Sequence, residues 1–438
     1  MRVGQGRAKH GATRIARCSA AHDIRRMKIH RMLGCALVLG AVSPNIACAQ
    51  RSYLFVWAGG KSGNEVMATI DATPASSTYG RLLATASTGQ VGVPHHTEPE
   101  LAPNGHLLAN DFGAGKTWLF DLHEPLHPRV LTSFGDVAGF SHPHTFIRLP
   151  NGRVLSTFQY RADSTAGPDT SSMTDGMGMG GHHVTGGLVE MDETGHPYLS
   201  RTATDTAIRD RNLYPYSVLP IPAMNRAVST TTDMDEADSA ATSEWVQIWR
   251  LSDLTLLRTI ALPPGPRGNE NRYTGESRVL ADGRSIYIHT FNCGLYLLRD
   301  VASEHPRATF VKGFEGTNCG VPILTGHYWL QTVPDAHALV ALDISDAEHP
   351  REVSRVTLPS DEAPHWIAID AAGQRVVLNS GGRGSRLFIL DLDRASGRLA
   401  LDEKFRDRGA ATAGISLSGS NWAGFTGTVI PHGAVFSR

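Results

Sequence analysis

The segment His144-Thr-Phe-Ile-Arg-Leu-Pro-Asn-Gly152-Arg-Val-Leu-Ser156 contains the pattern that decides the fold. An apolar stretch follows a histidine, reaches an Asn-Gly pair and is followed by a second apolar stretch. Asn-Gly between two such runs is typical of a β-hairpin, because the tight turns that join hairpin strands need positive φ angles. The segment therefore predicts two antiparallel strands with a histidine at the head of the first.

The same pattern recurs along the chain and indicates an internal repeat. Its copies begin at His96, His144, Tyr216, Glu276, Cys319, His365 and His432. A third apolar run follows most copies, as at residues 118–121 and 388–391, and an outer strand such as residues 352–357 comes after it. Four short strands per unit are typical of a β-propeller blade.

The two ends of this repeat region complement each other. The last copy starts at His432 with a single strand, whereas three spare apolar runs, at residues 53–57, 65–70 and 81–85, precede the first copy. Joined together they complete one blade and leave no sheet edge unpaired. We therefore predict an all-β, seven-bladed β-propeller over residues 50–438, with its last blade closed by N- and C-terminal strands and an insertion loop at residues 161–186.

The first 49 residues predict export rather than a folded unit. A basic start at residues 27–31 precedes an apolar run at residues 32–42 and the small residues Ala47-Cys48-Ala49. This order is typical of a secretory signal peptide, which we assign to residues 27–49 with cleavage after Ala49. Residues 1–26 are interpreted as an over-long gene start. The apolar run is too short for a membrane span, so we expect a periplasmic or secreted protein.

Charge and cysteine content limit the partners. The chain has 41 Lys and Arg against 42 Asp and Glu, so no net field favours a nucleic acid. After the leader only Cys293 and Cys319 remain, too few for a disulfide scaffold. In an oxidising compartment they either pair with each other or lie near a site. The oligomeric state is left open.

The head of each repeat predicts a metal site. The first strand of every propeller blade lines the central axis, so residues that begin these strands converge. Counting back from each turn gives the like positions His96, His144, Tyr216 or Ser217, Gly275 or Glu276, Asn318 or Cys319, His365 and His432. The first blade has one extra residue, which leaves a bulge at His95 open. Imidazole binds zinc, copper, iron and nickel. The predicted metal ligands are His95, His96, His142, His144, His365 and His432. The alternative is a polar, water-filled shaft whose histidines bond one another.

A second feature favours copper. The segment from Met173 to His183 carries Met173, Met177 and Met179, and thioether sulfur is a soft ligand that selects Cu(I). The alternative is a glycine-rich insertion with exposed methionines. His289, at a second-strand position, is interpreted as structural.

Several motifs resemble the selenium-binding protein / methanethiol oxidase family. They are Pro94-His95-His96-Thr97, Ser141-His142-Pro143-His144 followed by Gly187-Leu-Val-Glu-Met-Asp192, the turn from Leu342 to Pro350, and the segment from Leu390 to Gly397. The resemblance implies a propeller with histidine-bound copper that oxidises methanethiol with O₂ to formaldehyde, hydrogen sulfide and hydrogen peroxide. It assigns His95, His96 and His144 as copper ligands. Glu98-Pro-Glu-Leu101 replaces the cysteine-containing stretch of the family, so selenium binding is not expected.

The sequence thus predicts a copper-dependent oxidoreductase whose substrates are a small thiol and O₂. Glu276, on the same side of the shaft, is the predicted catalytic proton acceptor, because a carboxylate near a cation can be tuned for this role. Two alternatives stay open. One is a non-catalytic periplasmic propeller that binds a partner or serves as a scaffold. The other is a different metal enzyme on the same fold, such as a zinc or iron hydrolase or lactonase, which usually needs carboxylate ligands.

Overall fold

The computed structural model describes residues 51–60, 63–164, 183–208, 211–234, 243–380, 384–417 and 429–438. The predicted gene start, the signal peptide, residues 173–182 of the methionine segment and most of the predicted insertion loop lie outside these residues. Within the described ranges, no helix has the length and apolar character needed to cross a membrane.

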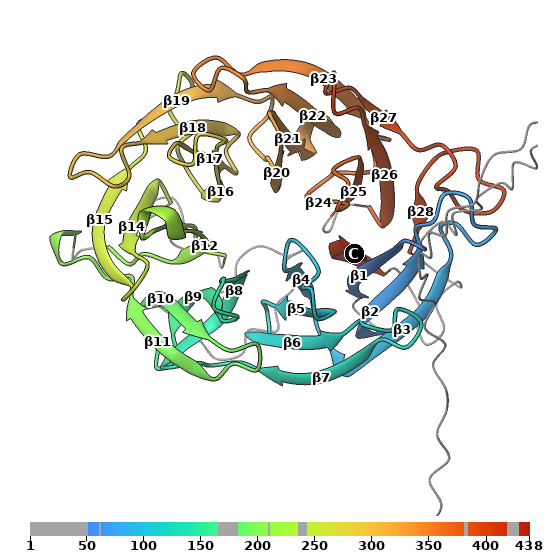
Figure 1. Cartoon of the computed structure of the whole chain (residues 1–438), viewed down its shortest axis with the longest axis horizontal. Helices are drawn as coiled ribbons and strands as arrows, with labels where there is room; N and C mark the ends of the chain where they lie inside the picture. The colour runs from blue at the N-terminus through green and yellow to red at the C-terminus, as the bar shows by residue number, and fades with distance from the viewer. Residues whose placement is uncertain are drawn as a thin grey trace, which may run out of the picture. The chain divides into compact units, whose positions relative to one another are not determined.

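Seven antiparallel sheets stand around a common axis as the blades of a propeller (Figure 1). Blade 1 contains β4 (Pro94–Thr97), β5 (His106–Asp111), β6 (Lys116–Asp121) and β7 (Arg129–Phe134). Blade 2 contains β8 (Phe140–Arg148), β9 (Val154–Arg161), β10 (Thr185–Met191) and β11 (Pro197–Thr202). Blade 3 contains β12 (Pro215–Ile221), β13 (Arg226–Thr231), β14 (Trp245–Arg250) and β15 (Thr255–Ala261). Blade 4 contains β16 (Thr274–Val279), β17 (Ile286–Thr290), β18 (Gly294–Arg299) and β19 (Arg307–Gly313).

The remaining blades include the closure of the ring. Blade 5 contains β20 (Pro322–Thr325), β21 (Tyr328–Val333), β22 (Ala338–Asp343) and β23 (Arg351–Thr357). Blade 6 contains β24 (Trp366–Ile369), β25 (Arg375–Asn379), β26 (Arg386–Leu392) and β27 (Leu399–Leu401), and β28 (Ile415–Ser416) also pairs with β26. Blade 7 contains β29 (Ile430–Phe436), β1 (Tyr53–Gly60), β2 (Gly63–Asp71) and β3 (Leu82–Val91).

Strands from the two ends of the chain form blade 7 together. β29 is its innermost strand and pairs antiparallel with β1, so that Val435 lies opposite Phe55. This pairing gives the inner edge of β1 a partner inside the ring. The predicted all-β fold, its seven blades and the closure of the last blade by both ends are confirmed.

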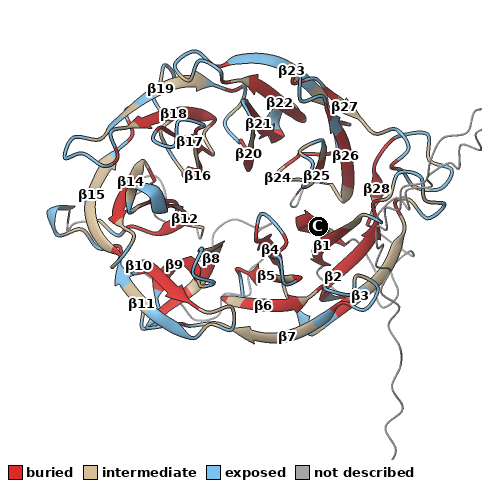
Figure 2. Ribbon diagram, in the orientation of Figure 1, coloured by how far each residue is buried: buried red, intermediate tan, exposed pale blue. Residues whose placement is uncertain are grey.

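The outermost strand of each blade is less buried than the strands inside it (Figure 2). In blade 5, β22 is buried along almost its whole length, whereas β23 is mostly exposed. The middle strands are covered on both faces by neighbouring blades, which explains their continuous apolar runs.

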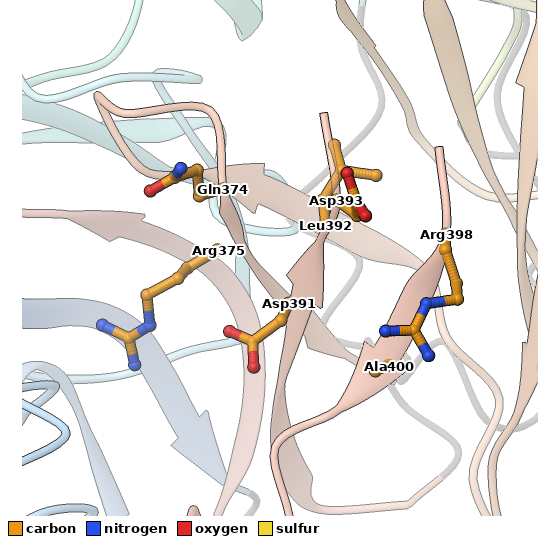
Figure 3. Close-up of a pocket in the computed structure, with 7 residues that line it drawn as sticks. All are labelled: Gln374, Arg375, Asp391, Leu392, Asp393, Arg398 and Ala400. Atoms are coloured by element: carbon orange, nitrogen blue, oxygen red, sulfur yellow. The ribbon is translucent and has the colours of Figure 1, made fainter. Parts of the chain in front are cut away.

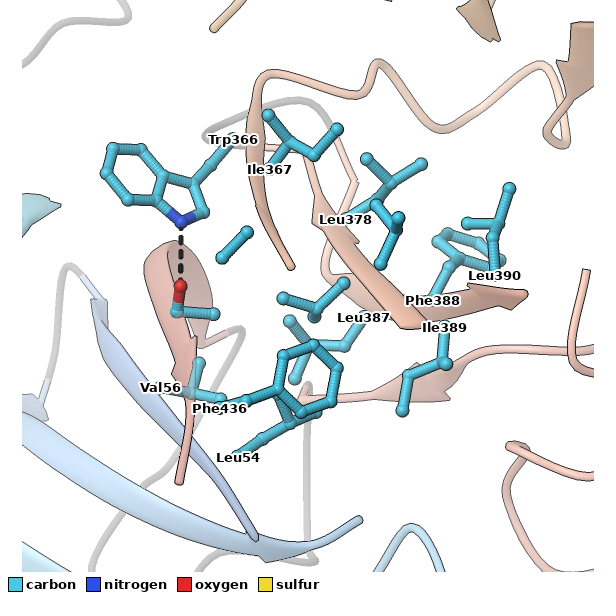
Figure 4. Packing of buried hydrophobic residues seen from close by; sticks show 14 of the residues in the cluster. Leu54, Val56, Trp366, Ile367, Leu378, Leu387, Phe388, Ile389, Leu390 and Phe436 are labelled. Atoms are coloured by element: carbon cyan, nitrogen blue, oxygen red, sulfur yellow. Dashed lines mark hydrogen bonds between the residues drawn. The ribbon is translucent and has the colours of Figure 1, made fainter. Parts of the chain in front are cut away.

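Blades 6 and 7 illustrate the packing between blades (Figure 4). Leu54 and Phe436 of blade 7 belong to the same buried cluster as Leu387 of blade 6. Each such side chain stabilises the fold by about 1.5–3 kcal/mol. The indole N–H of Trp366 also donates a hydrogen bond to the carbonyl of Ala434 across the two blades (2.9 Å).

A disulfide joins blades 4 and 5. Cys293, in the turn after β17, is bonded to Cys319, which precedes β20, with Cα atoms 5.1 Å apart. The sequence left this pairing open. Disulfides persist mainly in oxidising compartments.

Candidate metal centre

The inner strands of blades 1 to 4 share one irregularity, and the inner strand of blade 7 also shifts its register, at His432. The pairing register shifts between Pro94 and Thr97 in β4, Pro143 and Phe146 in β8, Pro215 and Val218 in β12, and Thr274 and Ser277 in β16. At each place two inner-strand residues lie opposite one residue of the second strand, which is a β-bulge.

The second-strand residue opposite each bulge of blades 1 to 4 makes the same hydrogen bond. Its side chain accepts a hydrogen bond from the backbone N–H of the second bulged residue. The pairs are His96 with Asn110 (2.8 Å), Thr145 with Thr157 (3.1 Å), Ser217 with Thr230 (3.1 Å) and Glu276 with His289 (2.8 Å). These bonds satisfy an N–H group that the bulge removes from the strand ladder.

The bulges correct the alignment of the repeats. The first bulged residues are His95, His144, Tyr216 and Gly275. His95, rather than His96, therefore matches His144. Counting back from the turns left His95 or His96 open because blade 1 has the longer connection, with 14 residues from His96 to Asn110 against 12 from Thr145 to Thr157.

Five histidines from blades 1, 2, 6 and 7 meet near the axis. One group consists of His95, His96 and His144, and a second of His96, His365 and His432. Within each group the nitrogen atoms that could hold a metal ion lie within 4.8 Å of one another. Since His96 belongs to both groups, the structure brings together five of the six histidines that the sequence selected.

The hydrogen bonds of two of these rings direct a bare nitrogen toward the cluster. Nδ1 of His144 lies 2.8 Å from the carbonyl of Tyr216, to which it can only donate, and His432 bonds to the carbonyl of Pro94. The Nε2 atoms of His144, His432 and His96, together with Nδ1 of His95, are buried without a hydrogen-bond partner among the described residues. Unpaired buried nitrogens are unfavourable by about 1–3 kcal/mol each, and a bound metal ion would satisfy them.

Electrostatics keep the five imidazoles neutral. Burial, followed by neighbouring histidines, lowers the pKa of His95, His96 and His432 well below the usual value. Burial also lowers the pKa of His144 to about 3 and that of His365 to about 4. A neutral imidazole keeps the lone pair that a metal needs.

His142 lies outside both groups. Its ring centroid is 5.3 Å from that of Phe112 and 5.1 Å from that of Tyr160, and its φ angle is +57°. Phe112 in turn lies 5.9 Å from the ring of His95. His142 therefore belongs to an aromatic layer beside the cluster, and its role as a ligand stays a prediction.

Glu276 also lies outside the two groups. Its carboxylate accepts a hydrogen bond from Arg278 (2.8 Å). Its charge reaches Tyr216, because burial and then Glu276 raise the pKa of that phenol. The ring of Tyr216 is 4.0 Å from that of His144. Glu276 is thus within electrostatic range of the cluster wall, and its role as proton acceptor stays a prediction.

Two neighbours of the cluster were not predicted: Asn110 supports His96 from the second strand, and the ring of Trp366 lies 4.8 Å from that of His96. Tyr216, one of the two converging positions named for blade 3, covers His144. The signal that could have identified Asn110 is the spacing of 12 to 14 residues between each bulge and its second-strand acceptor.

A surface pocket of about 320 Å³ lies elsewhere, against β25, β26 and β27 (Figure 3). Arg375, Asp391 and Arg398 are among its lining residues. Arg375 starts β25, whereas Asn379 at the end of that strand pairs with Trp366 at the start of β24, and its carbonyl accepts a hydrogen bond from the backbone N–H of His365 (2.8 Å). The pocket therefore belongs to the other end of the blade.

Fold and site define the class of this protein as a seven-bladed propeller that gathers buried imidazoles near its axis. No family model matches the sequence. The chain is 34% identical over 152 residues to a methanethiol oxidase of Hyphomicrobium sp, covering 30% of this chain and 34% of that protein. It is 27% identical over 116 residues to a methanethiol oxidase of Ruegeria pomeroyi, covering 24% and 26%. The match thus spans about a third or less of these curated relatives.

The solved structures agree at the level of the fold. A hypothetical selenium-binding protein from Sulfolobus tokodaii superposes with a TM-score of 0.65 at 14% identity, covering 89% of this chain and 94% of that one. A periplasmic gluconolactonase of Pseudomonas aeruginosa reaches 0.54 at 14% identity, covering 80% and 94%. The partial sequence matches agree with the predicted resemblance to the selenium-binding protein / methanethiol oxidase family.

Proposed function

We propose that this protein is an exported, copper-dependent oxidase of a small thiol, similar in activity to the methanethiol oxidases. The observation that carries the proposal is the cluster of five buried, neutral imidazoles, four of which have a nitrogen without a partner. Such nitrogens are the donors that a first-row transition metal requires. The oxidase activity itself comes from the partial match to methanethiol oxidases.

The metal would be held by His95, His96 and His144, with His365 and His432 completing the second group. Neither group contains a carboxylate, which disfavours the hydrolase and lactonase alternative. Imidazole alone suits several metals, and the family resemblance selects copper among them. When bound, copper would supply the redox centre between the thiol and O₂.

Residues of the chain would exclude water from the metal site and accept the proton of the thiol. Tyr216 and Trp366 cover His144 and His96 from the side, and both are buried. A thiol binds a metal as its anion, so its proton needs an acceptor. Glu276 is proposed for this role, with Arg278 holding its carboxylate. For methanethiol, the overall reaction balances with one water: CH₃SH + O₂ + H₂O gives HCHO + H₂S + H₂O₂.

The proposed export is supported by one feature of the fold. The disulfide between Cys293 and Cys319 is stable in an oxidising compartment such as the periplasm. Protein isolated from the periplasmic fraction should begin after Ala49, which N-terminal sequencing would determine.

Two measurements test the proposed activity. Elemental analysis and EPR of the purified protein should show copper with nitrogen hyperfine coupling, and copper-loaded protein should consume methanethiol and O₂ in equal amounts. A His127→Ala variant, altered at an exposed histidine, is the matched control and should behave as the wild type. Copper-loaded protein that leaves methanethiol intact would refute the oxidase. Protein that retains no metal after loading would favour the non-catalytic alternative.

A further inference from the structure

The first bulged residue of blade 4 differs in kind from those of blades 1 and 2. Where those blades have His95 and His144, blade 4 has Gly275. A Cβ atom on Gly275 would lie 2.2 Å from Cε1 of His289 and 2.8 Å from its Nε2. The imidazole of His289, on the second strand β17, therefore occupies the space that the missing inner-strand side chain would take.

This position places His289 within electrostatic range of His365, a member of the cluster. Its ring is fully buried and lies 5.1 Å from Phe291, whose ring stacks at 6.3 Å from His365. Burial chiefly lowers the pKa of His289 to about 3, and His365 contributes to the shift. His289 is therefore a sixth neutral imidazole on the inner side of the blades.

The backbone determines which nitrogen of His289 carries the proton. Nδ1 lies 2.8 Å from the N–H of Glu276 and 3.2 Å from the carbonyl of the same residue. The two contacts exclude each other, because a proton on Nδ1 would meet the amide hydrogen. The amide always has its hydrogen, and Asn110 meets the equivalent N–H of blade 1 with an oxygen acceptor. Nδ1 therefore accepts, and the neutral ring has its proton on Nε2.

His289 is thus the opposite of the metal-site histidines. His144 donates from Nδ1 and keeps a lone pair on Nε2, whereas His289 accepts at Nδ1 and has an N–H at Nε2. This N–H is buried and has no acceptor among the described residues. A buried donor without a partner is unfavourable and indicates a ligand that supplies the acceptor.

We propose that His289 Nε2–H is a hydrogen-bond donor for a small anion bound between blade 4 and the imidazole cluster. The identity of this anion as substrate or as an oxygen-derived product rests on the proposed oxidase function. The donor itself does not, since it follows from the tautomer and the burial of one ring. His289 would position the anion rather than hold the metal.

The tautomer is tested on metal-free protein with ¹⁵N-labelled histidine. Long-range ¹H–¹⁵N correlation spectra should show His289 protonated at Nε2 and unprotonated at Nδ1, with the His289→Gln variant providing the assignment. A proton on Nδ1 would overturn the proposal. This measurement is independent of copper and of activity.

Anion binding is tested with azide as the probe. His289→Phe should keep the wild-type copper content and weaken azide binding to the copper-loaded protein by about tenfold, the size of one lost hydrogen bond. His289→Gln retains an acceptor for Glu276 and an N–H donor, so it should recover most of the affinity. His327→Phe, at an exposed turn of blade 5, is the control and should change nothing.

The outcomes separate the two proposals. Loss of copper in His289→Phe would make this residue a ligand, and unchanged azide affinity would show that it contacts no anion. Either result overturns the inference. Wild-type protein that binds no copper would refute only the proposed function. In that case metal-free protein provides the test of His289 as a donor. Azide should shift the Nε2–H resonance of His289, and an unchanged resonance would contradict the inference.

Discussion

Blades 1 and 4 share a backbone and differ in chemistry. Both have a two-residue bulge in the inner strand, and in both the second bulged N–H donates to a second-strand side chain. Blade 1 fills the bulge with His95 and His96 and supports it with Asn110. Blade 4 has Gly275 and Glu276 in the bulge, and His289 behind it.

The comparison shows how one scaffold produces two kinds of contact. In blade 1 the side-chain amide of Asn110 accepts the hydrogen bond from the bulged backbone N–H, and the imidazoles of the inner strand keep their lone pairs for a metal. In blade 4 the imidazole of His289 accepts that bond at Nδ1, so its proton is on Nε2 and the ring is a hydrogen-bond donor. The bulge determines where the side chains lie. The residue on the second strand determines whether the blade presents lone pairs to a metal or an N–H donor.

The largest effect is expected when blade 1 and blade 2 lose their ligands. His96→Ala with His144→Ala removes at least one member from each histidine group. Metal affinity should fall more than about 100-fold, because loss of outer-shell support alone can reach that value. Elemental analysis after dialysis measures this, with His127→Ala as control. Full copper occupancy in the double variant would end the hypothesis of a shared site.

Removing the second-strand hydrogen-bond acceptor should weaken metal binding in blade 1, whose bulge carries metal-site histidines, but not in blade 3, whose bulge carries none. Asn110→Ala loses its bonds to His96 and Pro143 and should lower the free energy of unfolding by about 2 kcal/mol and metal affinity about tenfold. Thr230→Ala, at the same position in blade 3, should also destabilise the fold but leave metal affinity unchanged. Chemical denaturation and metal titration measure the two quantities. Equal metal affinities for both variants would contradict the comparison.

The glycine of blade 4 can be tested against the imidazole behind it. Gly275→Ala should destabilise the protein by about 1–3 kcal/mol, because the new Cβ would overlap the ring of His289. The same substitution in a His289→Ala background should have a much smaller effect. A coupling of about 1 kcal/mol or more in this double-mutant cycle is expected. Additive effects would show that the ring does not fill the space of the missing side chain.

The smallest expected effect is the pH dependence of stability that a buried carboxylate causes. Glu276 of blade 4 is paired with Arg278, whereas Glu65, buried beside Asp111 between blades 7 and 1, forms no ion pair within the described residues. Burial and then Asp111 raise the pKa of Glu65 to about 9. The folded state therefore keeps a proton that the unfolded chain loses above its ordinary pKa, so stability should fall as pH rises from about 4.5 toward 9.

Glu65→Gln should remove this dependence. Relative to the wild type, the variant should gain more than about 1.4 kcal/mol between the two ends of that pH range, the equivalent of one pKa unit. Urea denaturation across the range measures it, with exposed Glu403→Gln as control. Parallel pH profiles for Glu65→Gln and wild type would show that Glu65 is ionised in the folded protein.

Much of this molecule could be predicted from local patterns. Asn151-Gly152 and its counterparts predicted the hairpins, and the spare strands at residues 53–85 predicted the closed blade. His96, His144, His365 and His432 were selected as converging residues because each lies near the head of an inner strand. The sequence left open whether His95 or His96 matches His144, because a bulge changes the register without leaving a mark in the hydrophobic pattern.

The sequence alone determined the repeat, the blade count and the convergence of histidines, since these follow from strand periodicity and turn chemistry, which are local. Only the tertiary structure decided which histidines lie together, that His142 belongs to an aromatic layer, and that the ring of His289 occupies the space beside Gly275. These depend on contacts between residues far apart in the chain. A ring's hydrogen-bond partner determines which of its nitrogens carries the proton, and that partner is known only once the strands are paired.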